Sequence, residues 1–105
     1  MSKVLKLVLT DHWFEEIKSG RKTHEYRKAI PFWYKRLLAY QRVVVLCNSG
    51  YKLTRPQVQF QKTYPKNPER MTFKIKNITV VSGLDTDLHC DGMVFDIELG
   101  DRIDE

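Results

Sequence analysis

The segment GRKTHEYRK, residues 20–28, contains the side chains of this sequence that are best suited to chemistry. Five basic side chains surround one carboxylate, that of Glu25, directly after a glycine. A carboxylate accepts hydrogen bonds and Lys or Arg donates them, so a turn this dense in charge is suited to binding a polar ligand. A solvated loop with a surface ion pair from Glu25 to Lys22 or Arg27 is the simpler interpretation, and such a pair would contribute only about 0 to 1 kcal/mol.

A second polar turn, NSGYKLTRP at residues 48–56, combines cations, an aromatic ring and an amide in a similar way. Asn48 can both donate and accept hydrogen bonds, Tyr51 can stack on a planar ligand, and Arg55 can hold a phosphate. We therefore expect the two turns to face one pocket.

Hydrophobic periodicity predicts the elements that position the first turn. Residues 3–9 alternate as a strand. A short helix follows, with Gly20 in the left-handed position after its last turn. Residues 23–28 are extended again, and Pro31 is well placed to begin a second helix that runs to about Tyr40.

The spacing of Lys22 and Glu25 sets a constraint on this turn. In a regular strand the two side chains would point to opposite faces. Their convergence on one ligand therefore requires irregular backbone at Lys22, just after Gly20.

The second half of the chain has the patterns of strands. Residues 42–47 are a valine-rich run of the type found in buried strands, and residues 71–80 and 93–99 alternate. The parity of the alternation changes near Asn77, which predicts a bulge that keeps both sets of apolar side chains on one core. An extra strand is expected around residues 58–60.

The resulting order of elements predicts an α+β fold. Five or six strands with short connections and two short helices fit a small mixed β-barrel better than a sandwich or a parallel sheet. The segment at residues 57–70, which contains a loop with Pro65 and Pro68, is the part of the chain whose structure and role the pattern leaves open.

Length and composition describe one ordinary globular domain, residues 1–105. Hydrophobic residues make up 42% of the chain and charged residues 30%, without a run of about 20 apolar residues or a signal peptide. We expect a cytoplasmic protein that does not enter membranes. The formal net charge of +5 makes polyanions plausible partners, although the acids concentrate from Asp85 to Glu105.

Metal and cofactor motifs are not recognisable in the sequence. Cys47 and Cys90 have no CxxC spacing and are interpreted as free thiols. The run from Asp85 to Asp96 resembles a calcium loop superficially, but Cys90 stands where such a loop needs glycine. We expect neither a metal nor a cofactor.

The order LVLTDHWFEEIKSGRKTHEYRKAIPFWYKRL, together with NSGYKLTRP and the ending FDIELGDRI, resembles the ASCH domain family of PUA-like β-barrels, in particular its short bacterial and phage-borne members. The resemblance covers most of the chain, although residues 57–70 are longer than the corresponding segment of the short members. It implies a cleft in the barrel that is suggested to bind RNA or a nucleotide-like ligand.

The resemblance also implies which side chains surround that cleft. They come from the first polar turn, the second polar turn and the start of the second helix: Lys22, Glu25, Arg27, Asn48, Tyr51, Arg55, Trp33 and Arg36. Trp13 and Trp33 lie on apolar helix stripes, so a place in the hydrophobic core is the simpler interpretation for both rings.

An enzymatic function is the first alternative. Some members of the family are amidohydrolases of acylated cytidine that use a lysine in this turn, a threonine three residues later and a distant glutamate. This chain has the lysine, Lys22, but Glu25 stands at the threonine position, and a neighbouring carboxylate favours the ammonium form, which is a poor base or nucleophile. These residues would instead allow a different mechanism of hydrolysis. Glu25 would activate a water molecule, and Lys22 would stabilise the oxyanion.

We therefore expect a PUA-like module that recognises a base and a phosphate of RNA or of a nucleoside derivative in a basic cleft. An amidohydrolase acting on an acylated nucleoside such as N4-acetylcytidine is the second hypothesis. A protein-interaction module, which would present a contiguous exposed apolar patch, is the third. The sequence leaves open the ligand, the oligomeric state and whether any reaction is catalysed.

Overall fold

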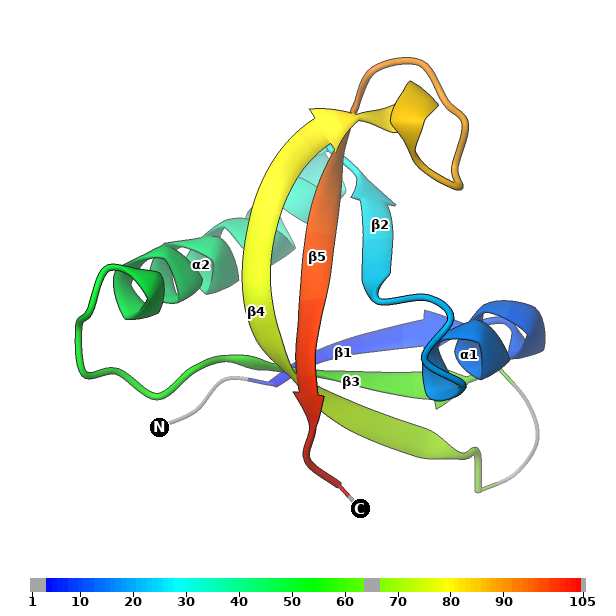
Figure 1. Cartoon of the computed structure of the whole chain (residues 1–105). Coiled ribbons are helices and arrows are strands. Elements are labelled where there is room, and N and C mark those ends of the chain that lie inside the picture. The colour runs from blue at the N-terminus through cyan, green and yellow to red at the C-terminus, as the bar shows by residue number, and fades with distance from the viewer. Residues whose placement is uncertain (1–3, 64–66, 105) are drawn as a thin grey trace.

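Five strands form one sheet that curls into a half-barrel, with two α-helices packed against it (Figure 1). The computed structural model describes residues 4–63 and 67–104. Along the chain the elements are β1 (Val4–Leu9), α1 (Asp11–Lys18), β2 (His24–Lys28), α2 (Pro31–Asn48), β3 (Gln57–Lys62), β4 (Arg70–Ser82), a 3-10 turn (Gly83–Asp85) and β5 (Met93–Arg102). The predicted α+β class and barrel-like architecture are confirmed.

The sheet order is β1-β3-β4-β5-β2, so the first two strands of the chain are the two outer strands of the sheet. β1 pairs with β3 in parallel, and all other pairs are antiparallel. Side chains of β2 and α2 reach the outer side of β1. Arg27 donates a hydrogen bond to the backbone carbonyl of Val8, and the hydroxyl of Tyr40 donates one to the backbone carbonyl of Val4. These contacts cover part of an edge that would otherwise offer free backbone groups.

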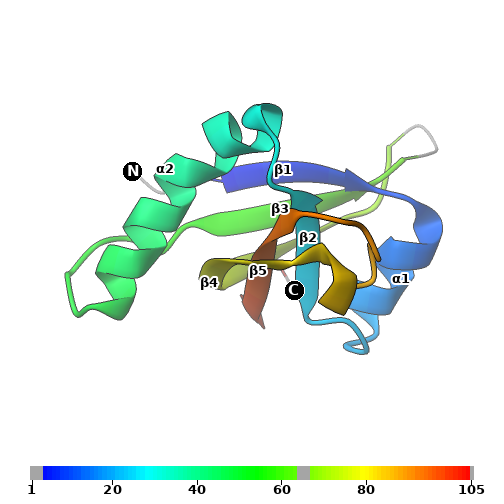
Figure 2. The ribbon, with the colours of Figure 1, turned by 90° about the horizontal axis from the view of Figure 1, so that it is seen from above.

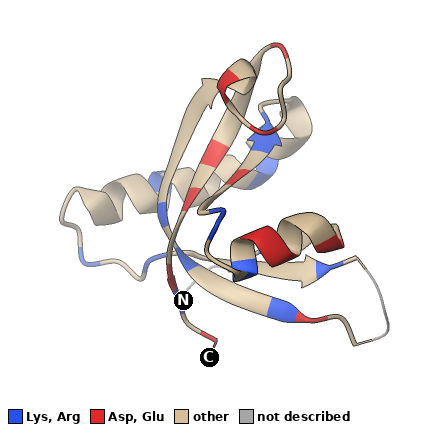
Figure 3. Cartoon of the chain, turned by 45° about the vertical axis from the view of Figure 1, so that its right-hand side comes forward, with Lys and Arg blue, Asp and Glu red and all other residues tan. Residues whose placement is uncertain are grey.

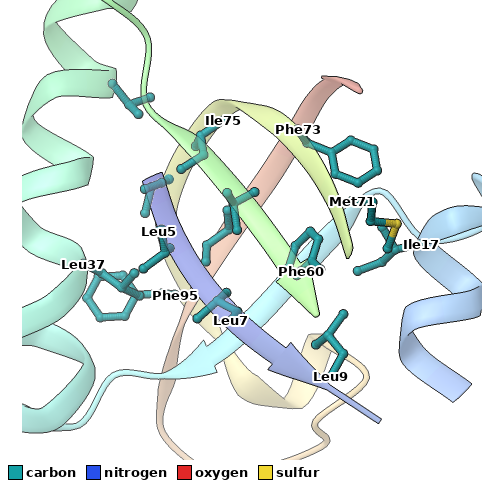
Figure 4. Packing of buried hydrophobic residues seen from close by; sticks show 14 of the residues in the cluster. Leu5, Leu7, Leu9, Ile17, Leu37, Phe60, Met71, Phe73, Ile75 and Phe95 are labelled. Carbon is teal, nitrogen blue, oxygen red and sulfur yellow. The ribbon is translucent and has the colours of Figure 1, made fainter. Parts of the chain in front are cut away.

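The concave face of the sheet carries the hydrophobic core (Figure 4). Leu5, Leu7 and Leu9 of β1 alternate inward, as the sequence pattern predicts, and meet Phe60 of β3 and Phe95 of β5. Each of these side chains is buried, so truncation of one of the leucines to alanine is expected to cost about 2 to 5 kcal/mol. The core therefore fixes the positions of the strand ends that surround the candidate site.

β4 bends strongly and is irregular where the sequence changes parity (Figure 1). Its register against β5 shifts between Phe73 and Ile75 and again between Ile75 and Asn77. The shifts allow both Ile75 and Ile78 to be buried although they differ in parity. The predicted irregularity near Asn77 is confirmed, and so is the extra strand around residues 58–60, which is β3. Pro65 lies outside the described residues.

The predicted strand at residues 42–47 is wrong, because α2 continues through this segment to Asn48. Helical spacing places Val44 seven residues after Leu37, and both side chains are buried in the core. Gln41 also donates to the carbonyl of Ile78 in β4. Tertiary packing along the helix thus overrides the strand preference of the valines.

Candidate functional site

The turn after α1 has the geometry that convergence of Lys22 and Glu25 requires. Gly20 is in the left-handed region with φ of 84°, and the amide of Lys22 donates to the carbonyl of Glu16 at 3.0 Å. Lys22 therefore lies in irregular backbone between α1 and β2. Its Nζ atom lies 3.4 Å from Oε1 of Glu25, so the predicted constraint is met.

Four charged side chains form a continuous cluster, which we call the charge cluster: Lys22, Glu25, Arg27 and Asp87. The Oε2 atom of Glu25 accepts from Arg27 at 2.8 Å, and Lys22 forms a second, close ion pair with Asp87. The exposed fraction is 10% for the Lys22 side chain and 7% for that of Glu25. The cluster holds two cations and two carboxylates, so its formal charge is zero.

This cluster lines a pocket of about 290 Å³ at the open side of the curled sheet, between the outer strands β1 and β2. Contributions come from both strands, from α1 and α2, and from the loop after the 3-10 turn. The lining residues are Val8, Leu9, Thr10, Trp13, Lys22, Glu25, Tyr26, Arg27, Lys28, Trp33, Asp87 and Leu88. Figure 2 shows this loop and α1 at the same end of the molecule.

Aromatic rings flank both cations of the charge cluster. Nζ of Lys22 lies 4.3 Å from the ring centre of Trp13 and 5.3 Å from that of Tyr26, and Cζ of Arg27 lies 5.0 Å from that of Trp33. Each distance is within the range of a cation–π contact. The pocket therefore combines apolar ring surface with fixed hydrogen-bond donors and acceptors.

Tyr26 lines the pocket and has a raised pKa. Burial raises the pKa of its phenol above the ordinary value of 10.0, and the nearby carboxylates of Asp96, Asp87 and Glu25 act in the same direction. At neutral pH the phenol is therefore a neutral group that can donate a hydrogen bond.

Arg27 retains an unused donor. Its Nε–H group is buried and has no hydrogen-bond partner among the described residues, although the guanidinium also contacts Glu25 and Val8. Buried donors of this kind are uncommon in folded proteins, because an unmatched polar group is costly. An acceptor atom of a ligand or a water could satisfy this group.

The second polar turn does not reach this pocket, so the expectation of a cleft shared by two turns is wrong. Because α2 extends to Asn48, it carries the turn to the opposite end of the molecule from α1 (Figures 1 and 2). There the guanidinium of Arg55 donates to Asn48 and to the carbonyls of Ile75 and Lys76. These bonds tie the end of α2 to β4, which gives Asn48 and Arg55 a structural role.

The other predicted site residues divide between the pocket and the surface. Trp33 lines the pocket and also packs against the core. Arg36 lies elsewhere, in a hollow with Lys35, where its guanidinium is 4.4 Å from the ring of Phe32. Tyr51 is 62% exposed beyond the end of α2.

Most of the other lining residues are not predicted from the sequence, and Trp13, Tyr26 and Asp87 are those with rings or charges near Lys22. Trp13 was assigned to the core but is 36% exposed, and Tyr26 alternates with Glu25 on a short strand without a distinguishing signal. Asp87 lies in the acidic run after β4, which the sequence presents as a polar loop. Nothing in the sequence connects it to Lys22, which is 65 positions away.

The described residues offer no group of three or more His, Cys, Asp and Glu side chains that could hold a metal ion. Within the same residues no helix is both long enough and apolar enough to cross a membrane. Comparison of the whole sequence with known protein families and with curated proteins found no match. The resemblance to ASCH domains therefore remains an expectation.

Proposed function

We propose that the pocket binds an uncharged nucleobase, either in a nucleoside or as an unstacked base of single-stranded RNA. The observation that carries this proposal is the neutral charge cluster set against the rings of Trp13 and Trp33 in one small pocket. An ASCH-like domain that acts as a nucleoside or RNA reader is the function that this chemistry supports best.

The size and the lining of the pocket favour a single heterocycle. A volume of about 290 Å³ is near the lower end of small-molecule sites. Nucleobases combine a ring face, which stacks on aromatic or guanidinium planes, with an edge of mixed donors and acceptors. The carboxylates of Glu25 and Asp87 can accept from the base, and Lys22 and Arg27 can donate to it.

The charge cluster favours a neutral ligand over a phosphate. Each of its cations is already paired with a carboxylate, so a phosphate would have to displace an acid and leave it unpaired. Exposed cations that could meet phosphates lie at the rim of the pocket and beyond it, where the end of β2 and the first turns of α2 come together (Figure 3). Lys28, Lys35 and Arg36 are all exposed there. In an RNA complex we expect the base in the pocket and the backbone along this rim.

Nuclear magnetic resonance titration with the four common ribonucleosides tests the proposal. Binding should shift the indole resonances of Trp13 and Trp33, and Asp87→Asn should weaken it by about tenfold or more, since one acceptor becomes an amide and Lys22 loses an ion pair. Asp101→Asn is the matched control, because Asp101 is exposed and lies outside the pocket. Shifts outside the pocket, or equal effects of the two variants, would contradict the proposal.

The position of Lys22 between two carboxylates supports a second candidate function, amide hydrolysis of an acylated nucleoside. Glu25 or Asp87 would take a proton from water as the water attacks the acyl carbonyl, and the ammonium of Lys22 would donate to the oxyanion. The same carboxyl group would then give its proton to N4 of cytidine as the C–N bond breaks, which releases acetate and cytidine. Chromatography of N4-acetylcytidine incubated with the protein tests this chemistry. Lys22→Met should abolish release of cytidine while Lys74→Met, a change at an exposed lysine, should not. Equal rates with and without protein would exclude this reaction.

A further inference from the structure

The side of α2 that faces away from the core exposes large apolar side chains beside its cations. Val45 is 50% exposed and Leu46 is 39% exposed, in the segment whose valines resemble a buried strand. Leu38 lies about two helical turns earlier on the same side and is also exposed. Exposed apolar side chains that gather on one surface often mark a site of interaction with another molecule.

The second polar turn enlarges this surface. The amide of Tyr51 donates to the carbonyl of Leu46, and the thiol of Cys47 contacts the carbonyl of Leu53. These contacts hold the turn against the last turn of α2, where Tyr51 and Leu53 expose large apolar side chains. The second polar turn, which does not line the pocket, thus extends the exposed surface of α2. We call this surface the α2 outer face, formed by Leu38, Arg42, Val45, Leu46, Tyr51 and Leu53.

The α2 outer face contains a hollow of about 350 Å³. Its lining residues, Gln41, Arg42, Val45 and Leu46, are neighbours on successive turns of the helix. Helices pack by placing side chains of one into the grooves between side chains of the other. A hollow of this form suits an inserted aliphatic or aromatic side chain of a second helix.

The charges on α2 restrict the partner. The helix contains no Asp or Glu, whereas Lys35, Arg36 and Arg42 are exposed. A second copy packed about a two-fold axis at the hollow would bring Arg42 against its own counterpart, which is unfavourable. Leu38, Val45 and Leu46 give a base no ring to stack on, and Tyr51 is the single aromatic side chain among the residues that form the α2 outer face. The pocket, with its several rings, therefore suits nucleic acid better than this surface does.

We propose that the α2 outer face docks an amphipathic helix of a partner protein, with an apolar stripe flanked by Asp and Glu. The apolar stripe would cover Leu38, Val45 and Leu46, and one of its side chains would fill the hollow. The acids would meet Arg42 and the other cations of α2, which favours correct partners and speeds association. This mode is the common helix-in-groove form of peptide recognition.

Two synthetic helical peptides with the same leucine stripe test the proposal, one with flanking glutamates and one with flanking lysines. They are titrated into the intact chain, and amide resonances are followed by nuclear magnetic resonance. The glutamate peptide should shift resonances of residues 38–46 and 51–53 and bind about tenfold or more tightly than the lysine peptide. Val45→Glu should weaken it by about tenfold or more. Val80→Glu is the control at a similarly exposed valine of β4, with an expected change within about twofold.

Four outcomes would overturn the inference. The first is no shift at this surface with the glutamate peptide up to about 1 mM, and the second is equal affinity for the two peptides. The third is self-association of the chain that Val45→Glu abolishes, which would assign the surface to a second copy. The fourth is tighter binding of a single-stranded RNA to the same residues, which would assign it to nucleic acid.

Discussion

The Nζ atom of Lys22 lies 3.4 Å from Oε1 of Glu25, although the two residues are on either side of the point where β2 begins. The left-handed Gly20 and the irregular backbone after it make this approach possible. Arg27 binds the other oxygen of the same carboxylate. One buried acid therefore organises both cations of the pocket.

Glu25→Gln should destabilise the fold by about 3 kcal/mol, because it removes the carboxylate that two largely buried cations share. The loss should not be larger, since Asp87 still pairs with Lys22. Urea unfolding monitored by circular dichroism measures the change. Glu16→Gln is the matched control: Glu16 pairs with Arg21 on the surface, and loss of that pair should cost about 0 to 1 kcal/mol. Equal losses in the two variants would contradict a structural role for the charge cluster.

Tyr26 should make stability depend on pH in the alkaline range. Its pKa in the folded state is raised above the ordinary 10.0, so unfolding releases a proton between 10.0 and the folded value. Its contribution to stability is complete below pH 10.0 and is lost as pH rises through the folded pKa. Relative to Tyr26→Phe, the unchanged protein should lose stability in this window. Tyrosinate absorbance should show Tyr26 ionising late among the five tyrosines, and ionisation at the ordinary pKa would contradict the burial of its phenol.

Trp13→Ala should weaken nucleoside binding by about 1 to 3 kcal/mol, the usual contribution of an aromatic ring to base stacking. Trp13 lies partly exposed at the pocket, so the free energy of unfolding should change less than the affinity does. Calorimetric titration and thermal unfolding of the same variant give both quantities. Unchanged affinity would remove Trp13 from the site.

Arg55→Ala should affect folding and not binding. The change removes the hydrogen bonds to Asn48 and to two carbonyls of β4, at a cost of about 1.5 to 3 kcal/mol. Nucleoside affinity, measured at a temperature where the variant is folded, should stay within about twofold. A large loss of affinity in a folded Arg55→Ala protein would restore this residue to the ligand site.

Alternation and turn chemistry predicted much of the fold. Leu5, Leu7 and Leu9 could be assigned to one face because strand side chains alternate, and Gly20 could be assigned to a left-handed turn. The irregularity near Asn77 followed from the requirement that Ile75 and Ile78 share a core. In each case the conformation that the local sequence favours is also the one that packs the core.

The rest depends on contacts that no local pattern contains. The valines of residues 42–47 favour a strand by propensity, but Val44 and Leu37 share a helix face that packs on the core. This one difference moves the second turn away from the pocket. Asp87 reaches Lys22 only because the loop after β4 lies over the turn after α1, an arrangement that only the folded sheet defines.

The salt dependence of affinity tests the central proposal most directly. One ribonucleoside that binds and its 5′-monophosphate are titrated calorimetrically into the protein over a range of salt concentrations. If the base binds to the charge cluster, whose four charges cancel, log affinity for the nucleoside should plot against log salt with a slope near zero. A requirement for the phosphate, with a slope of about one per phosphate contact, would contradict recognition of a neutral base.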